Sequence, residues 1–563
     1  MPKSAPAWRI AEYCARMDVS SIAYRQQQGA SMQYFALNPM IGYGAYARPD
    51  FPRAKDLLAH LDYLSIDRCL VSSIEARDAT PLHGNRKLLE EIAPWQERLY
   101  PAFVITPADF FIEASRQWLL EQARAGRKAF RVCPAISRFP LRQIERLLAE
   151  LAPCQPLLLL DFRGSNDPLL FRDLEYLAQK YPSVNFVLCQ HMWPSFGAIL
   201  DVLWRCRNIF LDISWLHMRQ AIELVKEHFG CERLLFGIGY KTHYGAAIGA
   251  LAHAQLTAAE REMIAHGNLE RLLQLPPLNR KLASDSPLLA RKPLWDAFRR
   301  GMPLSLPVID AHTHDCAANR GWYNRDIEPG RMLSAMLPDM DKHGVDRIIL
   351  SSEQALFSEP VDGNRALEKE ARKFPGRFSG YFVFNPLYEE KITVPVLDKF
   401  FRREFFVGFK LLPAYWAIPL TDPRYCRVWE YADRYALPIL IHTWGDAAAL
   451  TEIAPKYPRA AFLLGHSGGS DGGRRQCETI AAAASNTYFE FCGTFCSTLP
   501  WQDSIARFGS KRFVFGSDFA AHNQAWELSC FLSIPLPDKV LQPILGQNIQ
   551  RLLQRRQTSV SPN

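Results

Sequence analysis

The chain alternates short runs of apolar and β-branched residues with longer segments of helical periodicity. Such runs suit strands that are buried on both faces, and their alternation with helices is typical of βα units around a parallel sheet. In the C-terminal half we predict eight strands, at 308–314, 347–352, 378–386, 407–413, 438–444, 460–467, 487–493 and 512–519. Because eight strands close a (β/α)8 barrel, we expect this half to fold as a TIM-type barrel.

The N-terminal half repeats the same pattern. Ile66-Asp67-Arg68 returns 279 residues later as Val345-Asp346-Arg347, and Gly84-Asn85-Arg86 returns at the same offset as Gly363-Asn364-Arg365. A repeat of this length indicates duplication of a whole domain and not a solenoid of short units. The sequence therefore predicts an α/β protein made of two tandem (β/α)8 TIM-type barrels.

The domain boundaries follow from the repeat and from local composition. A segment that contains Pro, Asn, Ser and Asp, with an amphipathic patch at 294–298, separates the two copies and indicates a linker with one helix. The predicted organisation is a helical lead-in over 1–29, a first barrel over 30–276, a linker over 277–306, a second barrel over 307–556 and a tail over 557–563.

Composition and charge narrow the class of protein. Hydrophobic residues make up 48% and charged residues 22% of the 563 residues, which is ordinary for a globular protein with two buried cores. The net charge of +8 is spread out, with no block of five or more Lys or Arg. This distribution favours solubility, or attraction of an anionic small-molecule substrate, over nucleic-acid binding.

The cysteines and the N-terminal residues indicate the cellular compartment in which we expect the protein. The 13 cysteines are scattered, with no Cys-x-x-Cys pair, as expected of reduced thiols in a cytoplasmic protein. The first 28 residues contain no apolar core of signal-peptide length, and no run approaches 18 apolar residues. We therefore expect a cytoplasmic protein with no membrane contact.

The two copies serve as controls for each other. Packing is a sufficient reason for a residue that both copies keep, whereas a residue that differs between them is suspected of a chemical role. At the strand ends the second copy has Asp310, His312, His314, Lys410, His442, His466 and Asp518. The first copy has Ala36, Asn38, Met40, Arg131, Asp161, Gln190 and Gly239 in this series. We expect the second barrel to be catalytic and the first to be a degenerate barrel without metal ligands.

The ligand pattern of the second copy suits one divalent metal ion. His312 and His314 lie two positions apart on one strand, so both side chains point the same way. The C-terminal ends of all strands in a closed barrel converge on one face, where the other histidines and the Asp also lie. Imidazoles with one carboxylate suit zinc, our first expectation, and also manganese, iron or cobalt.

These motifs resemble the amidohydrolase superfamily. They are Asp310-Ala311-His312-Thr313-His314 on the first strand, Lys410 after Gly-Phe on the fourth, His442 on the fifth, His466 in Gly-His-Ser-Gly on the sixth and Asp518 after Gly-Ser on the eighth. The pattern is most similar to the amidohydrolase-related group of metal-dependent hydrolases and nonoxidative decarboxylases. It covers residues 300–556 and, with ligands missing, 30–276.

The resemblance implies roles for individual residues. His312, His314, His442 and Asp518 would hold the ion, and Asp518 would also shuttle a proton as a catalytic residue. His466 would be catalytic by polarising the substrate, although a hydrogen-bonded core histidine is the alternative. Lys410 would anchor a substrate carboxylate as an ammonium group; as a carbamate it would instead bridge to a second metal.

Further residues near the strand ends are weaker candidates. Trp444 and Tyr415 would form an aromatic wall, with core packing as an equal contender. His522 and Asn523 lie in the loop after the eighth strand and are candidates for substrate contact. Glu353 is a weaker candidate still, and we interpret Glu490, which Asp212 matches, as a structural carboxylate and Cys492 as a small buried hydrophobe.

The predicted function is cleavage of an amide, lactone or ester bond of a small polar substrate by metal-activated water. The alternative at the same site is a metal-dependent nonoxidative decarboxylase or related lyase, and an alternative of another class is a noncatalytic scaffold or ligand-binding protein. We expect the two barrels to pair as an intramolecular pseudo-dimer, with further self-association open. The degenerate half would then support the active half or lend a loop to its mouth.

Overall fold

The computed structural model describes residues 32–46, 48–162, 167–239, 245–315, 332–445, 447–492 and 499–557. The predicted lead-in over 1–29 and all but the first residue of the predicted tail lie outside these ranges, as does Gly493 at the end of a predicted strand. Among the described residues, no helix combines the length and the apolar character needed to cross a bilayer.

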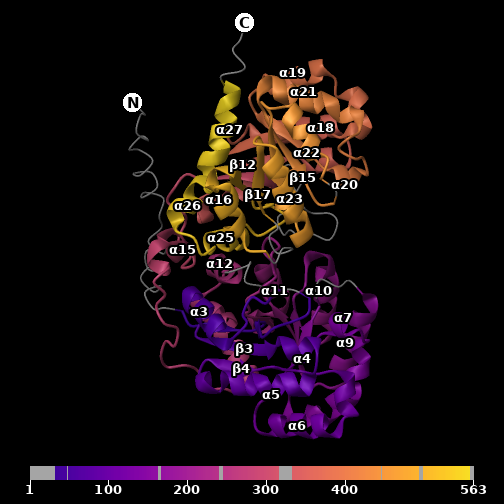
Figure 1. Ribbon diagram of the computed structural model, residues 1–563, viewed down its shortest axis with the longest axis vertical. Helices are drawn as coiled ribbons and strands as arrows, with labels where there is room; N and C mark the ends of the chain where they lie inside the picture. The colour runs from indigo at the N-terminus through magenta and orange to yellow at the C-terminus, as the bar shows by residue number, and fades with distance from the viewer. Residues whose placement is uncertain are drawn as a thin grey trace.

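The C-terminal half is an eight-stranded parallel barrel, as the hydrophobic pattern predicts (Figure 1). Its strands, each paired with the next in chain order, are β11 (Ile309–His314), β12 (Arg347–Ser351), β13 (Phe378–Val383), β14 (Phe406–Leu411), β15 (Pro438–His442), β16 (Ala461–Gly465), β17 (Thr487–Phe491) and β18 (Phe513–Phe515). A parallel bridge between Thr313 and Phe519 joins the first strand to the segment after the last. The sheet therefore closes on itself.

Helices cover the outside of this barrel. They include α16 (Met332–His343), α18 (Pro360–Ala371), α19 (Val394–Phe401), α21 (Cys426–Tyr435), α22 (Leu450–Lys456), α23 (Asp471–Ala483), α24 (Trp501–Phe508), α25 (Gln524–Leu532) and α27 (Asn548–Gln557). The barrel interior has its own apolar core, to which Ile349, Tyr381, Leu440 and Leu463 contribute from the strands. Leu552 of α27 packs against the same core. The barrel is thus a filled scaffold and not a pore.

Seven of the eight strands of this barrel end earlier than the hydrophobic pattern predicts, and two of these ends bear on the site. The predicted strand 460–467 stops at Gly465, because His466 (φ +58°) and Ser467 (φ +43°) turn into left-handed backbone. The predicted strand 512–519 stops at Phe515, and Gly516 follows at a point where a Cβ would collide with Glu490 and His312. Both departures occur at the mouth, where the chain turns to place His466 and Asp518.

The N-terminal half forms the first barrel, which also consists of parallel strands. Its strands are β1 (Phe35–Ala36), β2 (Met40–Ile41), β3 (Arg68–Ser73), β4 (Leu99–Pro101), β5 (Phe103–Val104), β6 (Ala129–Val132), β7 (Leu157–Asp161), β8 (Asn185–Cys189), β9 (Ile209–Asp212) and β10 (Leu234–Leu235). Only Ala102 separates β4 from β5, and its backbone N–H donates to Val71 at 2.8 Å. A parallel bridge between Leu37 and Gly237 completes the ring.

Buried side-chain hydrogen bonds repeat between the two halves. Asn268 donates to the backbone carbonyls of Cys231 and Leu234, and Asn548, 280 residues later, donates to the carbonyls of Ser510 and Phe513. A π-helical turn precedes each asparagine, at Met263–Gly267 and Pro543–Gln547. The duplication therefore extends from the sequence to irregular details of backbone geometry.

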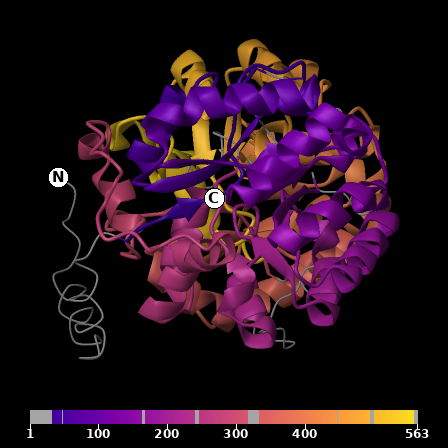
Figure 2. The same ribbon diagram turned by 90° about the horizontal axis from the view of Figure 1, so that it is seen from below.

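The barrels contact each other through equivalent elements (Figure 1), and the view from below shows the N-terminal half in front of the C-terminal half (Figure 2). Helix α12 (Ala246–His253) follows the last strand of the first barrel and packs on α25, which follows the last strand of the second. A Cβ at Gly249 would collide with the Ser529 hydroxyl, so the two helices approach closely at this glycine. Trp295 of α15 (Pro293–Phe298), within the predicted linker, is fully buried.

Candidate metal centre

The mouth of the C-terminal barrel is formed where its strands end. His312 and His314 lie on β11, Lys410 on β14 and His442 on β15, and Asp518 follows β18. A hollow of about 610 Å³, its open mouth included, is lined by Trp193, His314, Glu353, Leu356, Phe357, Leu412, Tyr415, His442, Trp444, His466, Asp518, Ala521 and His522. The structure thus brings most of the predicted site residues to one place.

Three predicted ligands form a tight cluster. His314 Nε2 lies 3.0 Å from Asp518 Oδ1, and His312 Nε2 lies 3.7 Å from the same oxygen. One donor atom from each of these side chains lies within 4.8 Å of the others. Donors this close can converge on a single ion after small side-chain movements.

His442 and His466 lie beside this cluster. Their ring centroids are 4.6 Å apart, and the ring of His466 is 4.8 Å from that of His312. His466 Nδ1 lies 2.9 Å from Cys492 Sγ. Burial raises the pKa of Cys492 well above its ordinary value, so this cysteine remains a thiol and not a nucleophilic thiolate.

Glu490 at β17 supports two of the predicted site residues. Its Oε2 lies 2.9 Å from His312 Nδ1 and accepts the backbone N–H of His466 at 2.8 Å. With Nδ1 engaged, the other ring nitrogen of His312 faces the cluster, as is common where a carboxylate orients a metal-ligating histidine. Glu490 is fully buried, and burial raises its pKa to about 8.

The protonation states of the histidines and of Asp518 in this cluster favour binding of a cation. Burial lowers the pKa of His312, His442 and His466 well below the ordinary value and also lowers that of His314. These imidazoles are neutral near pH 7. Burial by itself would raise the pKa of Asp518, but the hydrogen bond with His314 and the surrounding histidines hold it well below its usual range. The carboxylate is therefore ionised.

Lys410 lies at the bottom of the site. The side chain is fully buried, and its Nζ lies 2.5 Å from His312 Nε2. Burial lowers the pKa of Lys410, while the nearby Asp518 favours the charged form. The amine is thus a buried basic group beside the ligand cluster, at the position where sequence comparison predicts a cation.

The weaker candidates separate into two groups. Tyr415, Trp444 and His522 line the mouth, and His522 Nε2 lies 3.7 Å from Asp518 Oδ2. Asn523 lies away from this lining: its side chain caps α25 by accepting the N–H of Trp526 at 3.1 Å. Its backbone N–H donates to His217 of the first barrel at 2.6 Å. The structure thus places Asn523 between the barrels.

At the mouth of the first barrel, polar side chains contact one another. Asn38 donates to Asp212, as His312 contacts Glu490 in the second barrel. Arg131 donates to Ser72 Oγ at 3.1 Å and to Asn38 Oδ1 at 3.3 Å, and lies 4.0 Å from Asp161. Among the described residues, groups of His, Cys, Asp and Glu with the spacing of metal ligands occur only in the second barrel.

The donor set of the second barrel fits a divalent cation. Neutral imidazoles and one ionised carboxylate are the forms that ligate zinc, manganese, iron or cobalt. Among the described residues, His442 Nδ1 is buried without a hydrogen-bond partner, whereas His314 Nδ1 lies 3.4 Å from Glu353 Oε1. Buried polar atoms are normally satisfied, so His442 keeps a ring nitrogen that is available as a metal ligand.

Two supporting residues were outside the predicted site. The match with Asp212 favours a structural role for Glu490, and this pairing of carboxylates in both copies is the sequence signal for it. Trp193 belongs to the first barrel, and no local sequence pattern relates it to the second. It lies on the turn Trp193–Ser195 after β8 and lines the mouth.

A model of the amidohydrolase family matches residues 85–275 and 309–555. These two matches cover most of the chain and fall on the two barrels. The chain therefore belongs to the amidohydrolase family, as a tandem pair. A comparison with curated proteins finds no match.

Similar solved structures include both hydrolases and decarboxylases. A probable 2-pyrone-4,6-dicarboxylic acid hydrolase from Acinetobacter baumannii is 16% identical over 44% of this chain and 100% of its own, with a TM-score of 0.36. A 2,6-dihydroxybenzoate decarboxylase from Rhizobium is 18% identical over 44% of this chain and 98% of its own, with a TM-score of 0.34. A 5-carboxyvanillate decarboxylase from Sphingomonas paucimobilis is 15% identical over 44% of this chain and 99% of its own, with a TM-score of 0.33.

Proposed function

We propose that the C-terminal barrel is a metal-dependent hydrolase that cleaves an amide, lactone or ester bond of a small polar substrate. The observation that carries this proposal is the cluster at the mouth in which Asp518 Oδ1 lies 3.0 Å from His314 Nε2 and 3.7 Å from His312 Nε2. An ionised carboxylate beside a cation site can accept a proton from water, which hydrolysis requires.

In this proposal His312, His314, His442 and Asp518 hold one divalent ion, with zinc first and manganese, iron or cobalt as alternatives. When bound, the ion supplies a Lewis acid that activates water and polarises a carbonyl group. The protein's own contribution is to present these ligands in their deprotonated forms. Glu490 contributes by holding His312 at a distance of 2.9 Å.

Asp518 is the proposed proton carrier. Its side chain retains 15% exposure, so it faces the mouth where a substrate enters. It accepts a proton from the attacking water and passes it to the leaving nitrogen or oxygen as the bond between that atom and the carbonyl carbon breaks. His522 lies 3.7 Å from the second carboxylate oxygen and is itself held by Glu527 at 2.8 Å. The contacts from Glu527 through His522 keep the Asp518 carboxylate oriented.

His466 and Lys410 are the proposed electrophilic groups. His466 lines the mouth and donates a hydrogen bond to the oxygen on which negative charge develops. Lys410, beneath the mouth, attracts an anionic group of the substrate, in keeping with the predicted preference for anionic small molecules. As a carbamate, Lys410 would accompany a second ion, so metal stoichiometry distinguishes the two forms.

The test uses the metal-loaded full chain against a panel of amides, lactones, esters and phenolic carboxylates. We expect hydrolysis of at least one carbonyl substrate and loss of about 100-fold or more in kcat for Asp518→Asn. Asp503→Asn, an exposed aspartate on α24 of the same barrel, is the matched control and should keep full activity. Release of CO2 without any hydrolysis would overturn the hydrolase proposal in favour of a lyase.

A further inference from the structure

The first barrel reaches the mouth of the second. Among the described residues that line this mouth, Trp193 alone comes from the N-terminal half. Its turn follows β8, and Trp193, which is half-buried, lines the same hollow as His314, His466 and Asp518. The wall of the candidate active site is therefore composite.

Backbone pairing fixes the two barrels to each other beside the mouth. Met218 and His522 form an antiparallel bridge. On either side of it, the N–H of Asn523 donates to His217 O at 2.6 Å and the N–H of Arg219 donates to Ala521 O at 3.2 Å. The loop that carries His522 is thus paired, like a strand, with a segment of the first barrel.

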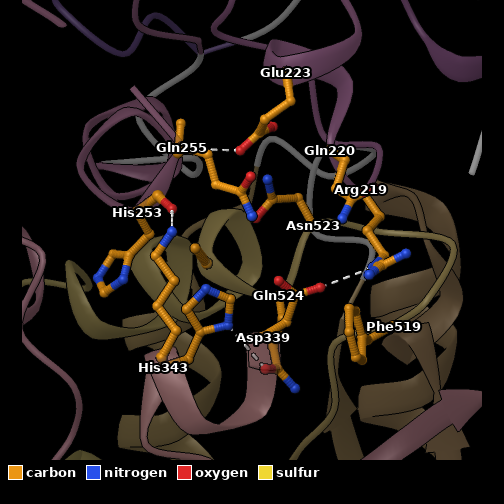
Figure 3. Close-up of a pocket in the computed structure, with 13 residues that line it drawn as sticks. Arg219, Gln220, Glu223, His253, Gln255, Asp339, His343, Phe519, Asn523 and Gln524 are labelled. Carbon is orange, nitrogen blue, oxygen red and sulfur yellow. Dashed lines mark hydrogen bonds and ion pairs between the residues drawn. The ribbon is translucent and has the colours of Figure 1, made fainter. Parts of the chain in front are cut away.

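Side chains reinforce this pairing from behind the loop (Figure 3). Arg219 is buried, and its Nε donates to Asp339 Oδ2 of α16 at 2.8 Å. The Arg219 guanidinium also lies 5.7 Å from the centre of the Phe519 ring, next to Asp518 in the chain. A buried ion pair of this kind defines position strongly, because breaking it leaves an uncompensated charge.

The first barrel is therefore held in fixed register at the mouth and is not a separate body tethered by a linker. An indole supplies a large, stiff surface with few rotatable bonds, which suits it to shape a pocket. Trp444, Tyr415 and Phe357 line the same hollow from the second barrel. Trp193 adds a fourth aromatic ring to this wall, and among the described lining residues this ring is the part of the wall that the first barrel supplies.

We propose that the metal-free barrel is a working part of the active site and that Trp193 is a specificity-determining residue for the substrate of the second barrel. The inference rests on the proposed function for the existence of a substrate. The position of Trp193 relative to the metal can be tested without any activity. The first experiment below therefore separates failure of this inference from failure of the proposed function.

The positional test uses the full chain labelled with 5-fluorotryptophan and loaded with Co(II). Trp193→Phe, Trp444→Phe and Trp204→Phe assign three of the 13 tryptophan resonances in fluorine NMR. Trp204 is 75% exposed on α10 (Phe196–Arg205) of the same barrel and is the matched control. We expect the paramagnetic ion to shift or broaden Trp193 and Trp444 and to leave Trp204 unchanged.

The outcomes separate the two claims. A shifted Trp444 with an unchanged Trp193 would overturn the composite wall and leave the metal centre standing. No shift in either would remove the metal centre, and the wall assignment with it.

The functional test compares kinetics on the substrate that the panel identifies. Trp193→Ala should raise KM about ten-fold while kcat changes little, and Trp193→Phe should recover most of the loss because an aromatic surface is restored. Trp204→Ala should match the parent chain. Equal KM values in Trp193→Ala and Trp204→Ala would contradict a specificity role.

Discussion

Glu490 Oε2 lies 2.9 Å from Nδ1 of His312, and the pair is buried completely at the centre of the C-terminal barrel. The first barrel keeps the carboxylate as Asp212 but replaces the histidine by Asn38, which donates to it. The two barrels thus both keep a supporting carboxylate, but only the second has a histidine, a potential metal ligand, at the supported position. This relationship makes Glu490 the clearest positioning residue of the proposed metal centre.

Glu490→Gln should weaken zinc affinity about 10- to 100-fold, because loss of a carboxylate that orients a metal-ligating histidine has effects of this size. Competition with a chromophoric chelator measures the affinity. Asp212→Asn, the matching change in the first barrel, should leave it unchanged. An unaltered affinity in Glu490→Gln would remove the positioning role.

Acid should destabilise the protein through histidines that are buried in neutral form. Burial lowers the pKa of His191 and of His343 from 6.5 to about 4. The unfolded chain then binds protons before the folded chain does, so the free energy of unfolding falls as pH drops from about 6.5 to about 4 and levels off below. Each group contributes at most about 3 kcal/mol to the loss.

Urea unfolding monitored between pH 7 and pH 4 tests this expectation. His343 lies between the barrels, where its Nδ1 is 3.0 Å from Gln524 Oε1. His343→Gln should therefore flatten part of the pH dependence. A free energy of unfolding that stays constant over this range in the parent chain would contradict the assignment of neutral buried histidines.

The barrel interface should be sensitive to a single methyl group. Gly249→Ala places a Cβ against Ser529 Oγ where α12 meets α25, so we expect a destabilisation of about 1 to 3 kcal/mol from overpacking. Gly472→Ala on α23, where a Cβ meets nothing within 4 Å, is the control. Thermal unfolding measures both. Equal transition temperatures would show that the helices can separate without cost.

Much of the fold follows from the sequence alone. Eight apolar runs predict the eight strands of the second barrel, and the 279-residue offset predicts the first barrel from the second. The strand ends were predicted too late at His466 and Asp518, because left-handed backbone at these residues is set by the crowded mouth and leaves no hydrophobic signal. Periodicity reports burial, whereas local turns depend on tertiary contacts.

The candidate site was predictable only in part. Comparison of the copies selects His312, His314, His442, His466 and Asp518, and the structure gathers all five at one mouth. The comparison could not place Asn523, which caps a helix, or reveal Trp193, which acts across the interface. Contacts between the barrels depend on how the two folded domains pack against each other. Comparison of the two sequence copies gives no information on this packing.

The central claim is that the C-terminal barrel binds one divalent ion through His312, His314, His442 and Asp518. Elemental analysis of the purified full chain, beside a variant carrying His312→Ala and His314→Ala, tests it most directly. We predict one ion per parent chain and less than about a tenth of that in the variant, since too few protein ligands remain once two of the four are removed. Metal content that is equal in the two proteins, or absent from an active parent chain, would contradict the claim.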